Sequence, residues 1–324
     1  MTLTTNQSGI YVDDSIKNEI KKLDAIIFDC DGVLIDVAKS YDLTIQKTTQ
    51  FILTNMANIS NPITIDSKII DGFKSTGGFN DEVDLTYAAI LSIVAADKLR
   101  KDQQEFIFNV ISNANSSGIL SVEQYIENII DVSDIKNKLS YPGTHHDNPL
   151  YQIFDQIFYG NELYLKLFKK TSQFLEPGLI NNDVIIVTNN LIEKLAKKFT
   201  SKISIVSGRG KESVRYSLKS LLDKFDLKNS AFLEDEPREL AKPNPESLIR
   251  SIRGMSCTYC IYVGDSMEDL IMAKKAKEQG CKTIFCGIIG TSKNPQVKLK
   301  LFQNNGALLV LDSIDLLPKV LNLE

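Results

Sequence analysis

Two kinds of hydrophobic pattern divide the chain. Short apolar runs bounded by polar residues or glycine occur near the start and again from about residue 183 onward. Such runs predict strands that are buried on both faces of a sheet. Between them, from Val37 to about Leu175, apolar residues recur at helical spacing. The pattern therefore predicts a sheet built from two separated stretches of chain, with a mostly helical domain inserted between them.

The second stretch alternates strands and helices. Helical segments follow the apolar runs over 191–199 and 211–224, and further helices begin near Pro245 and at Ser266. This alternation predicts a parallel sheet with helices on both faces, so the fold class is α/β, a Rossmann-like doubly wound sheet. The predicted strands are 25–28, 183–188, 202–206, 231–233, 261–263, 283–285 and 307–311.

These patterns suggest three parts. Residues 1–23 form an N-terminal extension, with a short helix over 14–22. Residues 24–36 together with 178–324 form the α/β core, and residues 37–177 form the inserted helical domain. The segment from Gly32 to Asp36 is the expected first hinge between the two domains.

The first apolar run leads directly into Asp29 and Asp31, which are followed by Gly32. Ligands bind at the carboxyl ends of strands in open α/β sheets. Two neighbouring carboxylates repel each other unless a cation lies beside them or one of them holds a proton. The alternative is a polar strand end followed by a turn, for which Asp and Gly are also suited.

Other predicted strands and turns also end in polar or charged residues, among them Ser207, Lys242 and Asp265. Because the carboxyl ends of parallel strands share one edge of a sheet, these side chains are expected at the same edge. Hard carboxylate oxygens suit Mg²⁺, and a hydroxyl, an ammonium and backbone amides suit a phosphoryl group. The predicted metal-site residues are Asp29, Asp31, Asp265 and Asp269, with Asp29, Asp265 and the backbone carbonyl of Asp31 as the expected direct ligands. The predicted phosphoryl-binding residues are Ser207, Gly208, Arg209 and Lys242.

Two loops interrupt the helical domain. The loop Ser75–Asn80 has a flexible double glycine before an aromatic and an amide, so Gly78 and Asn80 are candidate substrate contacts. The other loop holds the only two histidines, His145 and His146. Since no carboxylate or cysteine partner can be identified for either, they are predicted to lie in a solvated surface loop.

Composition narrows the function classes. The chain of 324 residues is 43% hydrophobic and 24% charged, with a net charge of −4. This balance gives no basic footprint for nucleic acid. No apolar run reaches the roughly 18 residues of a membrane span, and Met1–Lys22 lacks a signal-peptide core, so we expect a cytoplasmic protein.

The cysteines have a spacing that imitates a zinc site. Cys281 and Cys286 lie at opposite ends of one predicted strand, roughly 16 Å apart at 3.3 Å per residue. One tetrahedral zinc cannot bind both. The five cysteines are therefore interpreted as buried or strand-end thiols.

Four ordered segments resemble the four motifs of the haloacid dehalogenase superfamily. They are 29–34 (Asp-Cys-Asp-Gly-Val-Leu), Ser207, 242–245 (Lys-Pro-Asn-Pro) and 264–269 (Gly-Asp-Ser-Met-Glu-Asp). Lys242 follows Ser207 by 35 residues and precedes Asp265 by 23. The helical insertion resembles the cap domain of phosphoglycolate phosphatase-like members, although it is unusually large.

The resemblance implies roles for these residues. Asp29 would be the nucleophile that forms an aspartyl-phosphate, and Asp31 the general acid and then the general base. Ser207 and Lys242 would complete the catalytic set, and Mg²⁺ would be the cofactor. Dehalogenases of the superfamily lack the second acid, because a halide leaving group needs no proton, so Asp31 indicates phosphate chemistry.

Three functions remain open at this point. The first is a Mg²⁺-dependent phosphatase acting on a small phosphorylated metabolite, with no nucleic-acid or membrane partner. The second is a phosphomutase of the β-phosphoglucomutase type, which would keep both acids. The third is a non-catalytic scaffold that retains the fold. The sequence identifies neither the substrate nor the oligomeric state.

Overall fold

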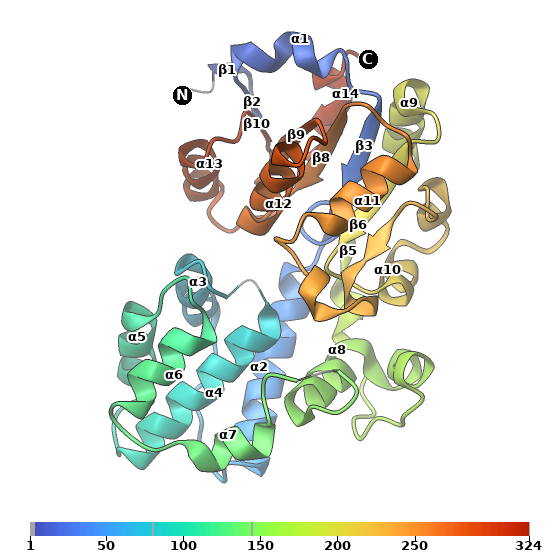
Figure 1. Cartoon of the computed structure of the whole chain (residues 1–324). Coiled ribbons are helices and arrows are strands. Elements are labelled where there is room, and N and C mark those ends of the chain that lie inside the picture. Colours follow the sequence, from blue (N-terminus) through green and yellow to red (C-terminus); the bar gives the residue numbers. More distant parts are fainter. Residues whose placement is uncertain (1–3, 80, 144, 324) are drawn as a thin grey trace. The chain divides into compact units, whose positions relative to one another are not determined.

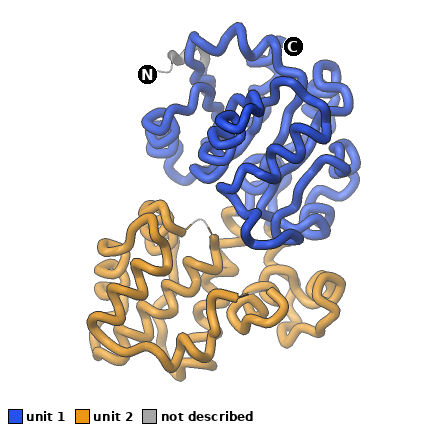
Figure 2. Tube along the Cα trace, in the orientation of Figure 1, with its two compact units in different colours: residues 1–37, 183–324 blue, residues 38–182 orange. Residues whose placement is uncertain are grey.

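The computed structural model describes residues 4–79, 81–143 and 145–323. The chain forms two compact units, residues 1–37 with 183–324 (unit 1) and residues 38–182 (unit 2) (Figure 2). The sequence-based boundaries lay at 36–37 and 177–178. The second boundary of the units falls later because Leu179 and Ile180 are buried in the core of unit 2. Within the described residues, no helix has the length and apolar character needed to cross a membrane.

Unit 1 contains an eight-stranded sheet with the order β1-β2-β10-β9-β8-β3-β6-β7 (Figure 1). All pairs from β10 to β7 are parallel, which confirms the predicted α/β class. The strands are β1 Thr4–Gln7, β2 Ile10–Val12, β3 Ala25–Phe28, β6 Ile203–Ser207, β7 Ala231–Phe232, β8 Cys260–Gly264, β9 Thr283–Ile288 and β10 Leu309–Leu311.

The buried strands divide their side chains between two apolar layers. In β3, Ile26 and Phe28 belong to one hydrophobic cluster, whereas Ala25 and Ile27 belong to the other. The alternation follows from the two-residue repeat of a strand. The first layer is covered by α1 Lys17–Ile20, α9 Asn189–Phe199, α10 Lys211–Leu218 and α14 Leu317–Val320. The second is covered by α11 Glu246–Gly254, α12 Met267–Glu278 and α13 Pro295–Asn304.

Two segments of unit 1 differ from the predictions. The N-terminal extension includes its short helix, but residues 10–12 also form β2, which pairs antiparallel with β10 and extends the sheet. The apolar run 183–188 contributes only β5, Val184–Ile185, whose residues are exposed. It pairs antiparallel with β4, Ile35–Asp36, in a separate ladder. An apolar run thus marks a strand without telling which sheet it joins.

Unit 2 is helical, as predicted for the insertion. Its central helix α4 is buried from Leu85 to Ala96 and packs against α2, α5, α6 and α8. A helix that is apolar on all sides is expected at the centre of a helical unit. The helices are α2 Ala38–Asn55, α3 Ser67–Ser75, α4 Glu82–Lys98, α5 Gln103–Asn113, α6 Ile119–Glu127, α7 Ser133–Leu139 and α8 Pro149–Phe168.

The interpretation of His145 as a solvated residue without a partner was wrong. Its Nδ1 lies 2.8 Å from Oδ2 of Asp155, whose side chain is 3% exposed. The imidazole also packs on the ring of Tyr151, with 4.2 Å between the centroids. The two residues of the pair are ten positions apart in a loop and a helix, so no local pattern reveals the contact. The five cysteines are free thiols, and none belongs to a possible metal cluster among the described residues.

Candidate active site

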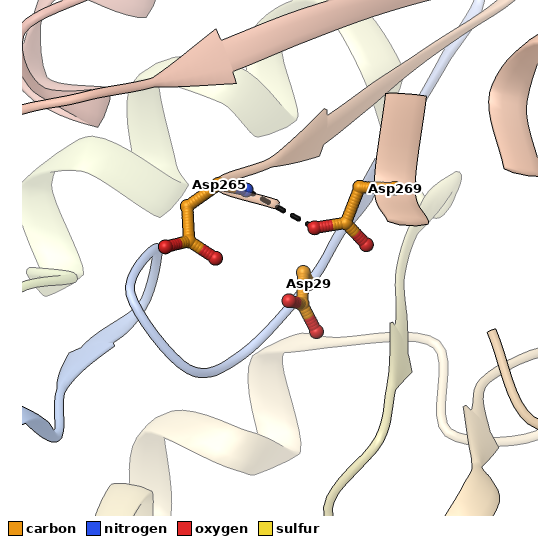
Figure 3. A group of neighbouring side chains, drawn as sticks. All are labelled: Asp29, Asp265 and Asp269. Atoms are coloured by element: carbon orange, nitrogen blue, oxygen red, sulfur yellow. Dashed lines mark hydrogen bonds between the residues drawn. The ribbon is translucent and has the colours of Figure 1, made fainter. Parts of the chain in front are cut away.

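The acids predicted at the strand ends come together. β3 and β8 are neighbours in parallel register, with Phe28 opposite Val263, and the backbone N–H of Asp29 donates to the Val263 carbonyl at 2.8 Å. Asp29 and Asp265 therefore follow adjacent strands at the same edge. One carboxylate oxygen each from Asp29, Asp265 and Asp269 lies within 4.8 Å of the other two (Figure 3).

Burial strongly perturbs Asp29. It is 6% exposed, and burial raises the pKa of its carboxyl group to about 8. Lys242 opposes this rise, while the negative charges of Asp269 and Asp265 add to it. A carboxyl group held at such a pKa indicates a functional site, because a structural carboxylate would be destabilising there.

Lys242 is buried between two of the acids. Its ammonium lies 2.7 Å from Oδ1 of Asp29 and 2.7 Å from Oδ1 of Asp269. Burial alone would lower the pKa of Lys242, but the carboxylates of Asp269 and Asp29 raise it well above its usual value. Its positive charge is therefore a permanent part of the site.

Asp269 is held by donors on both oxygens. Oδ2 accepts from the backbone N–H groups of Asp265 and Ser266, at 3.1 and 3.0 Å, and from the Ser266 hydroxyl at 2.8 Å. Oδ1 accepts from the Tyr262 hydroxyl at 2.8 Å and contacts Lys242. These contacts and the capping box with Ser266 fix the start of α12. The arrangement favours a supporting position for Asp269 within the predicted metal site.

Asp265 lies at the rim of the acid cluster. Its Oδ2 accepts from the ammonium of Lys298 on α13 at 2.7 Å, and the two side chains are 24% and 18% exposed. Gly32 approaches the same carboxylate so closely that a Cβ there would lie 2.4 Å from the Asp265 carboxyl carbon. Its φ of +73° also favours glycine. Both the backbone conformation and the lack of room for a side chain therefore require glycine at position 32.

The acid cluster fits a divalent cation. Three hard carboxylate ligands converge, and Oδ1 of Asp29 is buried without a well-formed hydrogen bond among the described residues, although it is close to Lys242. Asp29 and Asp265 would hold the ion, with Asp269 supporting the Asp265 backbone. An all-oxygen donor set suits Mg²⁺ or a similar hard cation.

The predicted phosphoryl-binding loop follows β6, the other neighbour of β3. Ser207 is buried and its hydroxyl accepts from the Arg209 backbone N–H at 3.3 Å, whereas Gly208 is exposed. The amides of Gly210 and Lys211 at the start of α10 already donate to the carboxylates of Glu234 and Asp235, at 2.8 Å each. These two amides, which follow the predicted phosphoryl-binding residues Gly208 and Arg209, are thus engaged within the protein.

Asp31 and Arg209 are linked to each other. The guanidinium of Arg209, 1% exposed, donates to Oδ1 of Asp31 at 3.2 Å, to Oδ2 of Asp183 at 2.7 Å and to Oγ of Ser213 at 2.8 Å. Asp31 is 25% exposed and Asp183 is 3% exposed. The side chain predicted to bind substrate is therefore engaged within unit 1 by Asp31, Asp183 and Ser213.

The predicted loop residues belong to unit 2. Gly78 lies so close to the loop ending at Gly118 that a Cβ would be 2.5 Å from the Gly118 nitrogen, and the neighbouring Phe79 packs on Phe73. Asn80 lies outside the described residues. A substrate contact by this loop stays a prediction.

Sequence reasoning did not identify Lys298, Asp183 or Tyr262. Each reaches the site only through tertiary folding, and each is surrounded in sequence by ordinary helix or strand residues. Only Asp183 had a signal in the sequence, because it is an acid that directly precedes an apolar run, whereas Asp29 directly follows one.

Comparison with known proteins agrees with this geometry. The family model described as haloacid dehalogenase-like hydrolase matches residues 23–277. No curated protein matches the chain.

Solved structures share the fold at low sequence identity. A Northeast Structural Genomics Consortium target has a TM-score of 0.63 and 17% identity, covering 93% of this chain and 98% of its own. Phosphatase Tt82 from Thermococcus thioreducens has a TM-score of 0.55 and 22% identity, covering 87% and 99%. A putative phosphatase from Clostridium difficile has a TM-score of 0.51 and 14% identity, covering 93% and 99%.

The family model covers most of the chain and includes the acid pair, Ser207, Lys242 and the acids that follow β8. The chain therefore belongs to the haloacid dehalogenase-like hydrolases.

Proposed function

We propose that the protein is a Mg²⁺-dependent phosphatase that hydrolyses a small phosphomonoester through an aspartyl-phosphate. The observation that carries the proposal is Asp29, a buried carboxyl group with a pKa raised to about 8, set against Lys242 and within 4.8 Å of the Asp265 and Asp269 ligand atoms. The family supports a hydrolase, and two of the similar structures are named as phosphatases, Tt82 from Thermococcus thioreducens and the one from Clostridium difficile.

In the first step, a carboxylate oxygen of Asp29 attacks phosphorus and the bond to the leaving oxygen breaks. Asp29 must be ionised to attack. Since burial opposes ionisation, positive charge beside it is required, and the Lys242 ammonium at 2.7 Å supplies part of that charge. A bound Mg²⁺ would supply the rest and would neutralise charge on the phosphoryl oxygens.

Asp31 handles the proton in both steps. It donates a proton to the leaving alkoxide as the phosphorus–oxygen bond breaks. It then removes a proton from the water that attacks phosphorus in the aspartyl-phosphate, which releases inorganic phosphate and regenerates the Asp29 carboxylate. Ser207 ends β6, the exposed residue Gly208 follows it, and the Ser207 hydroxyl and the Gly208 amide would bind the phosphoryl oxygens.

Phosphate release tests the proposal. The purified protein is incubated with p-nitrophenyl phosphate and a panel of metabolite phosphomonoesters, with Mg²⁺ and with EDTA. We expect Mg²⁺-dependent release that Asp29→Asn abolishes. Release by Asp29→Asn equal to that of the parent would refute Asp29 as the nucleophile, and undiminished release in EDTA would refute the metal requirement.

Two further measurements sharpen the mechanism. Asp31→Asn removes the base for the second step, so acid-quenched samples with p-nitrophenyl phosphate should carry one phosphoryl group on the peptide that contains Asp29. Product analysis with a hexose 1-phosphate separates the reaction classes. Free phosphate supports the phosphatase, whereas isomerised sugar phosphate would replace it by a mutase.

A further inference from the structure

The guanidinium of Arg209 is buried and hydrogen-bonded to other side chains of unit 1. Arg209 lies in the turn between β6 and α10, and three of its nitrogens donate to Asp31, Asp183 and Ser213 at 3.2, 2.7 and 2.8 Å. An arginine that bound a phosphoryl group would present its planar fork to the ligand. Here the fork spans two carboxylates of unit 1, and 1% of the side chain is exposed.

Asp183 is one of the two carboxylates that contact the Arg209 guanidinium. Its side chain is 3% exposed, and Oδ2 accepts from Arg209 and, at 2.8 Å, from the hydroxyl of Ser217 on α10. A buried carboxylate without such partners would be strongly destabilising. The Asp183 carboxylate and the Arg209 guanidinium therefore hold each other in one place, and the position of Arg209 is defined before any ligand binds.

The other carboxylate belongs to Asp31, which lies in the loop after β3. This loop is fixed at several points: the Gly32 N–H donates to the Ile35 carbonyl at 2.8 Å, and the Thr291 hydroxyl donates to the Gly32 carbonyl at 2.9 Å. Beyond it, Ile35 and Asp36 pair with β5, which directly follows Asp183. The backbone ladder and the contacts of Arg209 thus join the same two segments, the one that carries Asp31 and the one that begins at Asp183.

A general acid must present its proton along the bond to the leaving oxygen, and small displacements are costly. Binding of Oδ1 by Arg209 restricts rotation of the Asp31 carboxyl group and thereby sets the direction of its second oxygen. We propose that Arg209 is a positioning residue for Asp31, held in place by Asp183 and Ser213. The inference rests on the proposed phosphatase function and replaces the predicted role of Arg209 as a substrate ligand.

Leaving-group dependence distinguishes this role from a merely structural one. Expulsion of p-nitrophenolate needs little protonation, whereas expulsion of an aliphatic alkoxide requires it. The parameter kcat/KM reports only steps up to the release of the alcohol. We therefore measure kcat/KM for p-nitrophenyl phosphate and for an alkyl phosphate, with the parent, Arg209→Met, Arg209→Lys, Asp183→Asn and Asp31→Asn.

For Arg209→Met we expect a loss of about 10²-fold or more with the alkyl phosphate and less than about tenfold with p-nitrophenyl phosphate, the pattern that Asp31→Asn should also show. Asp183→Asn should show the same selectivity with a smaller loss, and Arg209→Lys should recover part of the alkyl activity. The control is Arg215→Met on α10, whose side chain is 36% exposed and pairs with Asp223, and it should behave as the parent.

The outcomes separate the two proposals. If the parent hydrolyses neither ester with Mg²⁺, the phosphatase function fails, and this inference fails with it. If the parent is active and Arg209→Met loses equal factors on both esters, or loses nothing, only the positioning role is overturned. Should Arg209→Met fail to fold by circular dichroism, Arg209→Lys and Asp183→Asn decide the question by the same comparison.

Discussion

Replacing Asp29 should stabilise the protein. Burial raises the pKa of Asp29 from 3.8 to about 8, so this carboxyl group lowers the free energy of unfolding at neutral pH. Above the unfolded pKa, the unfolded chain releases this proton while the folded chain keeps it. Folding is therefore penalised by about 1.36 kcal/mol for each pH unit between the two pKa values.

Asp29→Asn removes this titration. Relative to the parent, the variant should gain about 4 kcal/mol of unfolding free energy between pH 4.5 and 7.5, three pH units, and nothing further above about pH 8. The loss of one of the two Lys242 partners shifts the absolute difference, but it does so equally across this range because Lys242 stays charged. The slope with pH is therefore the expected signature.

The assay is urea denaturation in EDTA at several pH values, followed by circular dichroism because the chain contains no tryptophan. The matched control is Asp223→Asn, whose side chain is 64% exposed and whose difference from the parent should stay within about 0.5 kcal/mol at every pH. A difference between Asp29→Asn and the parent that does not change with pH would refute the reasoning. Saturating Mg²⁺ should stabilise the parent more than the variant.

Three other substitutions probe the acid cluster. Lys298→Met should tighten Mg²⁺ binding, measured by calorimetry, about two- to fivefold, because the partly exposed Lys298 ammonium no longer competes with the ion for Asp265. The control Lys300→Met should leave the affinity unchanged. Gly32→Ala should abolish detectable Mg²⁺ binding, since its Cβ would overlap the Asp265 carboxylate. Tyr262→Phe should cost about 1–3 kcal/mol in urea denaturation, because a buried, charged acceptor loses a donor. Equal affinity for Lys298→Met, retained binding for Gly32→Ala, or an unchanged midpoint for Tyr262→Phe would contradict these expectations.

The chemistry-bearing strand ends could be predicted from the sequence because each is a local feature. The run Ala25–Phe28 is apolar enough to be buried on both faces, and the residues after it must then lie at the carboxyl edge of the sheet. The same reasoning applies to Ser207 after β6 and to Asp265 after β8. Parallel register brings these ends together without any further information.

The partners of those residues could not be predicted, because they depend on which elements become neighbours. The sequence places Asp183 before an apolar run, but only the fold brings it 2.7 Å from the Arg209 guanidinium. Lys298 lies 33 residues beyond Asp265 on a helix whose charged face looks like an ordinary solvated surface. The pairing of His145 with Asp155 was missed for the same reason.

The two lysines beside the acid cluster have different consequences. Lys242 is 8% exposed and touches Asp29 and Asp269, so its removal would take the positive charge away from two buried acids. Lys298 is 18% exposed and pairs with Asp265, so water can solvate its ammonium when that pair opens. A divalent cation can therefore displace Lys298 at little cost but cannot displace Lys242. The positive charge beside Asp29 is therefore buried in the core, whereas the positive charge beside Asp265 lies at the rim, where we expect an ion to replace it.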